Sequence, residues 1–315
     1  MGFLEWATMS RMKEAEGSSA RREEAESGSG PPLPHPPIAP ADEAAVGELV
    51  SAMNLRRLYR DVTLALRSGL RDAMADFSFV RTRGLRNLLK FFRSIAGSDE
   101  SIRLFRHSQT IPELRVVPVL FRNSLQQSKD NPVVSLSHIF GVEPVKIISP
   151  ATDSEVAIAL RVLEGCCLLH SGSAALAHKH KAIEVLTNIL STRGTIEQGA
   201  CLDALISVLL DSSSNQMDFR ECHAIEKVTD LIKDEQADEN IRLKCGEFLL
   251  LLVGYVNRTE NSPLANIHDE MRRSLGEKCA SLIWAASQFG STLDPEQRQT
   301  ALQIQARRVV ESLEL

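Results

Sequence analysis

Two stretches of this sequence are similar to each other and lie about forty residues apart. The first is AIEVLTNIL at residues 182–190, and the second is AIEKVTDLI at residues 224–232. Self-similarity at such a period is typical of folds that stack one supersecondary unit, so it constrains the architecture strongly. The apolar residues of both copies follow helical spacing: Ile183, Leu186, Ile189 and Leu190 in the first, and Ile225, Val228, Leu231 and Ile232 in the second.

A strongly apolar segment precedes each copy, ALRVLEGCCLLH at 159–170 and ACLDALISVLLD at 200–211, and a third, RLKCGEFLLLLV, follows at 242–253. Helices that are apolar around most of their circumference are expected between two layers of other helices. A unit of one buried and one amphipathic helix cannot cover its own apolar face, so copies stack. The sequence therefore predicts an all-α fold, an armadillo/HEAT-like α-solenoid with a disordered N-terminal tail.

Composition changes along the chain predict its division into parts. Residues 1–42 are rich in Glu, Ser and Pro, which is typical of a disordered tail. Residues 43–290 are expected to form the armadillo-like domain, with an irregular insert at 123–150 where three X-Pro dipeptides break the helical pattern. Asp294 before Pro295 is a good helix start, and we expect a C-terminal helix within 291–315.

The repeat region resembles the cell division control protein 14 family of the septation initiation network, which is unrelated to the phosphatase of that number. The resemblance covers residues 159–253, and its most specific element is RLKCGEFL at 242–249. It implies a non-catalytic partner that binds and supports a Ste20-like (germinal-centre type) protein kinase in a cytokinesis or cell-polarity cascade. It also implies a cytoplasmic location, extending to spindle poles or the division site.

Four polar residues stand in otherwise apolar repeat helices and are candidates for partner binding. If the solenoid surface binds a kinase, we expect a few arginine or aromatic anchors to supply most of the affinity. Hydrogen bonding between repeats is an equally good interpretation of the same residues. These candidates are Arg161, Asp203, Arg242 and Lys244.

A second candidate surface comes from an excess of positive charge between residues 56 and 93. It can be the solvated face of amphipathic helices, or a docking face for an acidic partner, because arginine binds carboxylates bidentately. The alternative function is nucleic-acid or anionic-membrane binding, although nucleic acid is disfavoured because no aromatic stacking platform accompanies the cations. The cations are Arg56, Arg57, Arg60, Arg67, Arg71, Arg81, Arg83, Arg86, Lys90 and Arg93, against Asp61, Asp72 and Asp76.

Motifs for catalysis are missing from the sequence. No phosphate-binding loop, dinucleotide loop, nucleophile elbow or zinc-protease helix occurs, so we expect no enzyme, no cofactor and no small-molecule substrate. His178 and His180 form an HxH pair, but they lie at helix ends and connectors, and no metal site is expected. The longest apolar run, 248–256, is about half the length of a membrane-spanning helix. We expect a soluble cytoplasmic protein.

Two Ser-Pro dipeptides match the minimal pattern of a proline-directed kinase site. They are Ser149-Pro150 and Ser262-Pro263, each in an expected loop. Phosphorylation there would add negative charge beside a junction between repeats. Two such dipeptides are close to chance in a chain of 315 residues, so the switch remains a hypothesis.

Overall fold

The computed structural model describes residues 40–126, 149–259, 262–288 and 295–313. Every regular element in these ranges is a helix and none is a strand, which confirms the all-α prediction. Within them no helix combines the length and the apolar character that crossing a bilayer requires. The helices are α2 (Pro40–Ala73), α3 (Ser78–Ile95), α4 (Asp99–Ser108), η1 (Pro112–Leu114, a 3₁₀ turn), α5 (Val116–Arg122), α7 (Asp153–Leu169), α8 (Gly172–Lys179), α9 (Ala182–Thr192), α10 (Thr195–Leu209), α11 (Ser213–Glu221), α12 (Ala224–Lys233), α13 (Glu239–Val256), α14 (Ile267–Leu275), α15 (Glu277–Ser287) and α16 (Pro295–Glu311).

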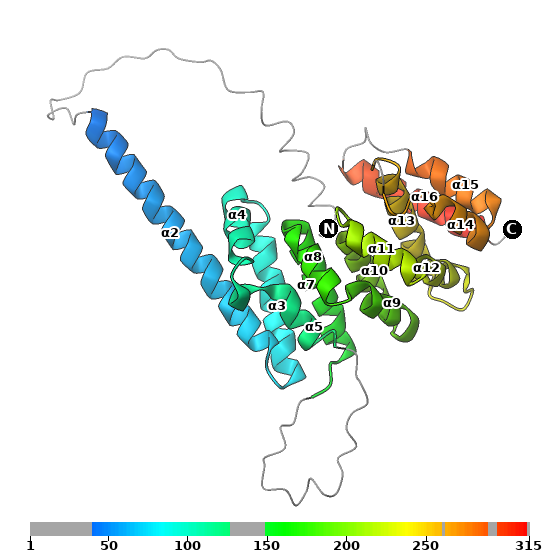
Figure 1. Cartoon of the computed structure of the whole chain (residues 1–315), viewed down its shortest axis with the longest axis horizontal. Helices are drawn as coiled ribbons and strands as arrows, with labels where there is room; N and C mark the ends of the chain where they lie inside the picture. Colours follow the sequence, from blue (N-terminus) through cyan, green and yellow to red (C-terminus); the bar gives the residue numbers. More distant parts are fainter. Residues whose placement is uncertain (1–39, 127–148, 260–261, 289–294, 314–315) are drawn as a thin grey trace, which may run out of the picture.

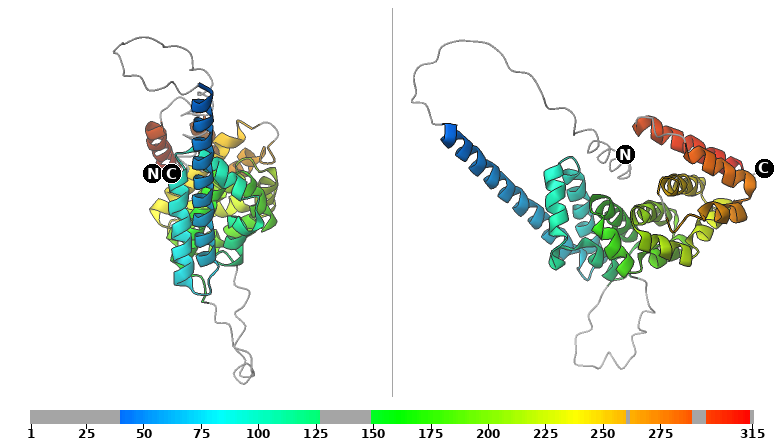
Figure 2. Two further views of the ribbon diagram at one scale, coloured as in Figure 1. Left: turned by 90° about the vertical axis from the view of Figure 1, so that its left-hand side faces the viewer. Right: turned by 45° about the horizontal axis from the view of Figure 1, so that its top comes forward.

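The longer helices form a row in the order of the sequence. Each of α2, α3, α7, α10, α13 and α16 packs against the next (Figure 1). The shorter helices α5, α8, α9, α11, α12 and α14 form a second row along one side of the first. The N-terminal half of α2 extends beyond its neighbours, as both views of Figure 2 show. One continuous apolar core runs between the rows, from Val62 in α2 to Val310 in α16.

The sequence repeat corresponds to a repeated group of three helices. Its two amphipathic copies are α9 and α12, which begin at Ala182 and Ala224 as the sequence predicts. Both start after a left-handed residue in the same place, Lys181 with φ 54° and His223 with φ 50°. Short helices α8 and α11 occupy the segments for which the sequence predicts only connectors.

The apolar helices α7, α10 and α13 lie in the middle of the row, as expected from residues that are apolar on all sides. Leu160, Leu205 and Leu249 are completely buried, and Cys166, Cys201 and Cys245 are buried beside them as free thiols. Removing so much apolar surface from water is the main stabilising contribution to this stack. Burial raises the pKa of the Cys166 thiol to about 12, so it stays protonated and behaves as a small apolar group.

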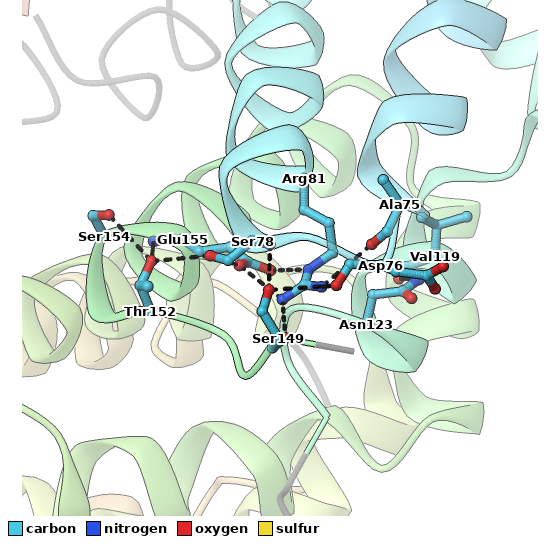
Figure 3. Close-up of polar contacts among 10 residues, drawn as sticks. All are labelled: Ala75, Asp76, Ser78, Arg81, Val119, Asn123, Ser149, Thr152, Ser154 and Glu155. Carbon is cyan, nitrogen blue, oxygen red and sulfur yellow. Dashed lines mark hydrogen bonds and ion pairs between the residues drawn. The ribbon is translucent and has the colours of Figure 1, made fainter. Parts of the chain in front are cut away.

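A buried ion pair joins α3 to α7, although 74 residues separate its partners. Arg81 Nε and Nη2 donate to the two carboxylate oxygens of Glu155 at 2.7 and 3.1 Å (Figure 3). The remaining donors of Arg81 reach the carbonyl oxygens of Ala75, Asp76 and Ser149. Since every N–H of the guanidinium has an acceptor, the desolvated charge is fully compensated.

The described residues cover the predicted domain division only in part. The tail at 1–42 lies outside the described residues except for its last three, where α2 begins at Pro40. Of the insert at 123–150, residues 127–148 also lie outside them. The last helix is α16, which begins at Pro295 within the predicted 291–315. The boundaries therefore remain predictions.

Candidate partner-binding site

Three of the four predicted anchors meet on neighbouring helices. Asp203 of α10 lies between Arg161 of α7 and Lys244 of α13. One oxygen of the Asp203 carboxylate, Oδ2, accepts from Arg161 Nη1 at 2.5 Å. The other, Oδ1, lies 2.9 Å from Lys244 Nζ. A single carboxylate thus links three consecutive helices of the long row.

A fourth residue, Glu164, belongs to the same group, which we name the Asp203 cluster. It lies one turn after Arg161 on α7, and Arg161 Nη1 donates to its Oε2 at 3.3 Å. Only 1% of the Glu164 side chain is exposed, whereas 39% of Arg161 and 30% of Lys244 are. The cations therefore form the accessible side of the cluster and the carboxylates its floor.

Burial and charge together set the protonation of the cluster. Desolvation, with the Asp203 carboxylate adding to it, raises the pKa of Glu164 to about 7, in spite of Arg161. Desolvation opposes the charge of Arg161, but Asp203 and Glu164 together raise its pKa above the usual value. Glu164 thus exchanges its proton near neutral pH, and the net charge of the cluster is about zero to plus one.

Beside the cluster a groove of about 710 Å³ opens between α13 and α16. Lys244 lines both the cluster and this α13–α16 groove. Its other walls are mixed, with Leu243 and Glu247 from α13 and Ile304 and Arg307 from α16. Burial raises the pKa of Glu247, with Lys244 opposing this and Asp203 adding to it. A polar groove with two apolar side chains, Leu243 and Ile304, among its charges suits a peptide segment of a protein partner.

Arg242 lies apart from the other three candidates. Only 8% of it is exposed, and its Nε donates to the carbonyl of Ile232 at the end of α12, at 3.0 Å. This hydrogen bond ties two successive helices together, which is the inter-repeat bonding expected as the alternative interpretation. Arg161, Asp203 and Lys244 also link successive helices, but Arg161 and Lys244 are partly exposed as well, so partner binding remains a prediction for these two.

The sequence interpretation did not name Glu164 and Glu247 as candidates for partner binding. Glu164 had a usable signal, because an acid three residues after an arginine on a helix is expected to contact it. Glu247 stands three residues after Lys244 and had the same signal. What the sequence could not show is that both would face Asp203, which comes from a different helix.

The remaining candidate residues have separate surroundings. His178 Nδ1 lies 2.6 Å from Asp218 Oδ2, whereas the ring of His180 stacks on Phe121 at 5.6 Å, so the two histidines have different partners. Within the described ranges no three His, Cys, Asp or Glu residues group as metal ligands. Of the two Ser-Pro sites, Ser262 is 8% exposed and bonded to Gln216, and Ser149 is half-buried.

Comparisons with known proteins gave one result. The family model described as Cell division control protein 14, SIN component, matches residues 133–302, which is 170 of the 315 residues. The matched range contains the whole Asp203 cluster and the α13 side of the groove. Neither the comparison with curated proteins nor that with solved structures found a match.

Proposed function

Since the chain belongs to the Cell division control protein 14 family of septation initiation network components, we propose that it is a non-catalytic adaptor that binds a Ste20-like protein kinase and supports its activity. The resemblance seen at residues 159–253 is confirmed by the longer family match. As an adaptor it would act in the cytoplasm and at spindle poles or the division site. It would need no cofactor, metal or small-molecule substrate.

The adaptor proposal includes an armadillo-type solenoid as its scaffold. Support comes from the two groups of three helices, α7–α9 and α10–α12, which share the left-handed residue before their last helix. Further support is that the long helices pack in sequence order, each against the next. Stacked repeats present an extended surface, which this class of protein uses for binding.

The Asp203 cluster beside the α13–α16 groove is the observation on which the proposal rests most. Asp203 fixes Arg161 and Lys244 in position, so their side chains lose little further freedom when a partner binds. Each cation keeps unused N–H donors on its exposed side, and these suit a carboxylate or phosphate of the partner. Leu243 and Ile304 in the groove would then contact an adjacent apolar side chain of the partner.

Binding to a purified Ste20-like kinase domain tests this assignment. We expect Lys244→Gln with Arg307→Gln to weaken binding at least about tenfold, which corresponds to roughly 1.4 kcal/mol. The matched control is Lys233→Gln with Arg272→Gln, which also removes one exposed lysine and one exposed arginine from ion pairs, but on α12 and α14. Arg242 is left unchanged because it is buried.

Three results would contradict the proposal. The first is equal affinity of the two double variants. The second is the absence of any Ste20-like kinase among proteins recovered with the full chain from dividing cells. The third is phosphate transfer that persists after the kinase in the complex is inactivated. A non-catalytic adaptor predicts that this transfer disappears.

A further inference from the structure

Three large apolar side chains lie in solvent at the turn between α2 and α3. Met74 is 52% exposed, Phe77 51% and Phe79 73%. The two phenylalanine rings stack on each other, with centroids 6.0 Å apart and planes 28° from parallel. We call these three residues the α2–α3 tip. A cluster of exposed aromatic side chains at one point of a surface indicates an interaction site.

The buried residues of the same turn hold this tip in place. Ser78, between the two phenylalanines, donates its hydroxyl to Glu155 Oε2, and its backbone N–H donates to the hydroxyl of Ser149. The carbonyl of Asp76, before Phe77, accepts from Arg81 (Figure 3). Because the residues on both sides of Phe77 are fixed inward, the phenylalanines are directed outward.

Positive charge surrounds the tip and continues along α3. Arg71 and Arg83 flank it, and both lie within 3.6 Å of the largely buried Asp72 carboxylate, which they share. Arg86, Lys90 and Arg93 follow Arg83 on the exposed face of α3, at helical spacing. Among the described residues these three make no ion pair. Their charge is therefore available to an external partner.

We propose that the α2–α3 tip and the exposed face of α3 bind the surface of an anionic phospholipid bilayer. Aromatic and long apolar side chains at the end of a helical hairpin can enter the headgroup region, while arginine and lysine stay among the phosphates. A row of cations over several helical turns matches a uniformly negative surface. The α2–α3 turn lies at the end of the helical hairpin (Figure 1), and this suits a bilayer better than a peptide, which binds in a groove.

This inference goes beyond the kinase adaptor and does not depend on it. The tip lies on α2 and α3, whereas the α13–α16 groove lies at the other end of the helix row (Figure 1). Lipid binding and kinase binding can therefore fail separately. An adaptor with both surfaces would bring its kinase to a membrane.

Vesicle flotation with the full chain tests the inference. We compare phosphatidylcholine vesicles with vesicles containing about one third phosphatidylserine, at low and at physiological salt. Arg86→Glu with Lys90→Glu should weaken binding to the anionic vesicles at least about tenfold, because each basic residue near such a surface strengthens binding on the order of fivefold. The same change of charge at Lys227→Glu with Lys278→Glu, on α12 and α15, is the control.

The apolar part of the surface has its own variants. Phe77→Ser with Phe79→Ser should reduce vesicle binding severalfold, and Ile196→Ser, at a residue 74% exposed on α10, should not. Brominated lipids should quench the fluorescence of a Phe77→Trp chain more than that of the parent chain. Equal loss in test and control variants would overturn the inference. So would the absence of binding to anionic vesicles, including the case in which the chain instead binds single-stranded RNA or an acidic peptide.

Discussion

Gly84 shows how a single residue permits the α2–α3 pairing. A Cβ at this position would lie 2.5 Å from the backbone nitrogen of Ala73 and 2.7 Å from the carbonyl oxygen of Gly69. Both of these are backbone atoms, so a side-chain rotation cannot relieve the contact. The two helices can approach this closely only because residue 84 has no side chain.

We therefore expect Gly84→Ala to destabilise the fold by about 1 to 3 kcal/mol, as is usual when a packed interface is overfilled. Gly47→Ala is the matched control, because a Cβ there meets nothing within 4 Å and alanine favours the helix. Urea denaturation followed by circular dichroism measures both. Equal stability of the two variants would show that α2 and α3 do not cross as described.

Glu164 should make stability depend on pH. Its pKa is about 7 in the folded chain against the usual 4.5 of a glutamate in water, so between these values unfolding releases a proton. The free energy of unfolding therefore falls as the pH rises from 4.5 to 7, and this group contributes a slope of at most about 1.4 kcal/mol per pH unit. Above pH 7 its contribution no longer changes.

Glu164→Gln should remove this slope, because glutamine has no proton to release. Denaturation at pH 5, 6, 7 and 8 measures it in the parent and the variant. Glu184→Gln, at an exposed position on α9, controls for the loss of a carboxylate. If the parent and Glu164→Gln lose stability equally between pH 5 and 7, Glu164 is not the titrating group.

At the scale of elements, the Arg81–Glu155 pair determines how α3 meets α7. Thr152 and Glu155 match the sequence pattern of a helix capping box, and the Thr152 hydroxyl does accept from the Glu155 N–H at 3.3 Å. The Glu155 carboxylate does not return to the cap, however. It turns to Ser78 and Arg81 of α3, and a local helix signal thereby becomes a contact between helices.

Arg81→Met should cost on the order of 3 to 5 kcal/mol, because it leaves the Glu155 carboxylate buried and unpaired. Adding Glu155→Gln should restore a large part of this, since the uncompensated charge is then gone. Arg193→Met breaks the exposed 2.8 Å pair with Asp153 and should cost less than about 1 kcal/mol. If Arg81→Met and Arg193→Met lower the free energy of unfolding by similar amounts, the Arg81–Glu155 pair is solvated and not buried.

At the scale of the whole molecule, α16 covers the last apolar helix of the row. Ala306, Val309 and Val310 are buried against α13, and a Cβ on Gly246 would lie only 3.3 Å from Ala306 Cβ. The interior helices have neighbours on both sides, and among the described helices α16 and α15 pack on the outer side of α13. The end of the stack therefore depends on this helix.

Ending the chain at Gln288 should lower the melting temperature by several degrees and increase binding of an apolar dye, because it uncovers α13. A chain without residues 1–39, which the sequence predicts to be disordered, should melt with the parent. Differential scanning fluorimetry of the three chains measures this. An unchanged melting temperature after loss of α16 would contradict its role as a terminal cap.

The candidate site could be predicted in part from the sequence. Arg161, Asp203 and Lys244 were identifiable because each is a charged residue within an apolar helix. Arg242 has the same signature. Positions two apart on a helix differ by about 200° around its axis, however, so Arg242 and Lys244 face opposite sides. The α2–α3 tip was not predicted, because an exposed phenylalanine and a buried one look alike in the sequence.

By itself the sequence determined the helical class, the position of the repeat and the family, because all three depend on residues close together in the chain. The spacing of apolar residues predicts α9 and α12 from local sequence alone. The period of about forty residues is visible by comparing the two similar stretches. Only the tertiary structure decided which side chains meet. Asp203 lies 42 residues from Arg161, and Glu155 lies 74 from Arg81. Such pairs form because packing of the helices brings the two side chains together in the interior. A charge that is buried away from water requires a partner.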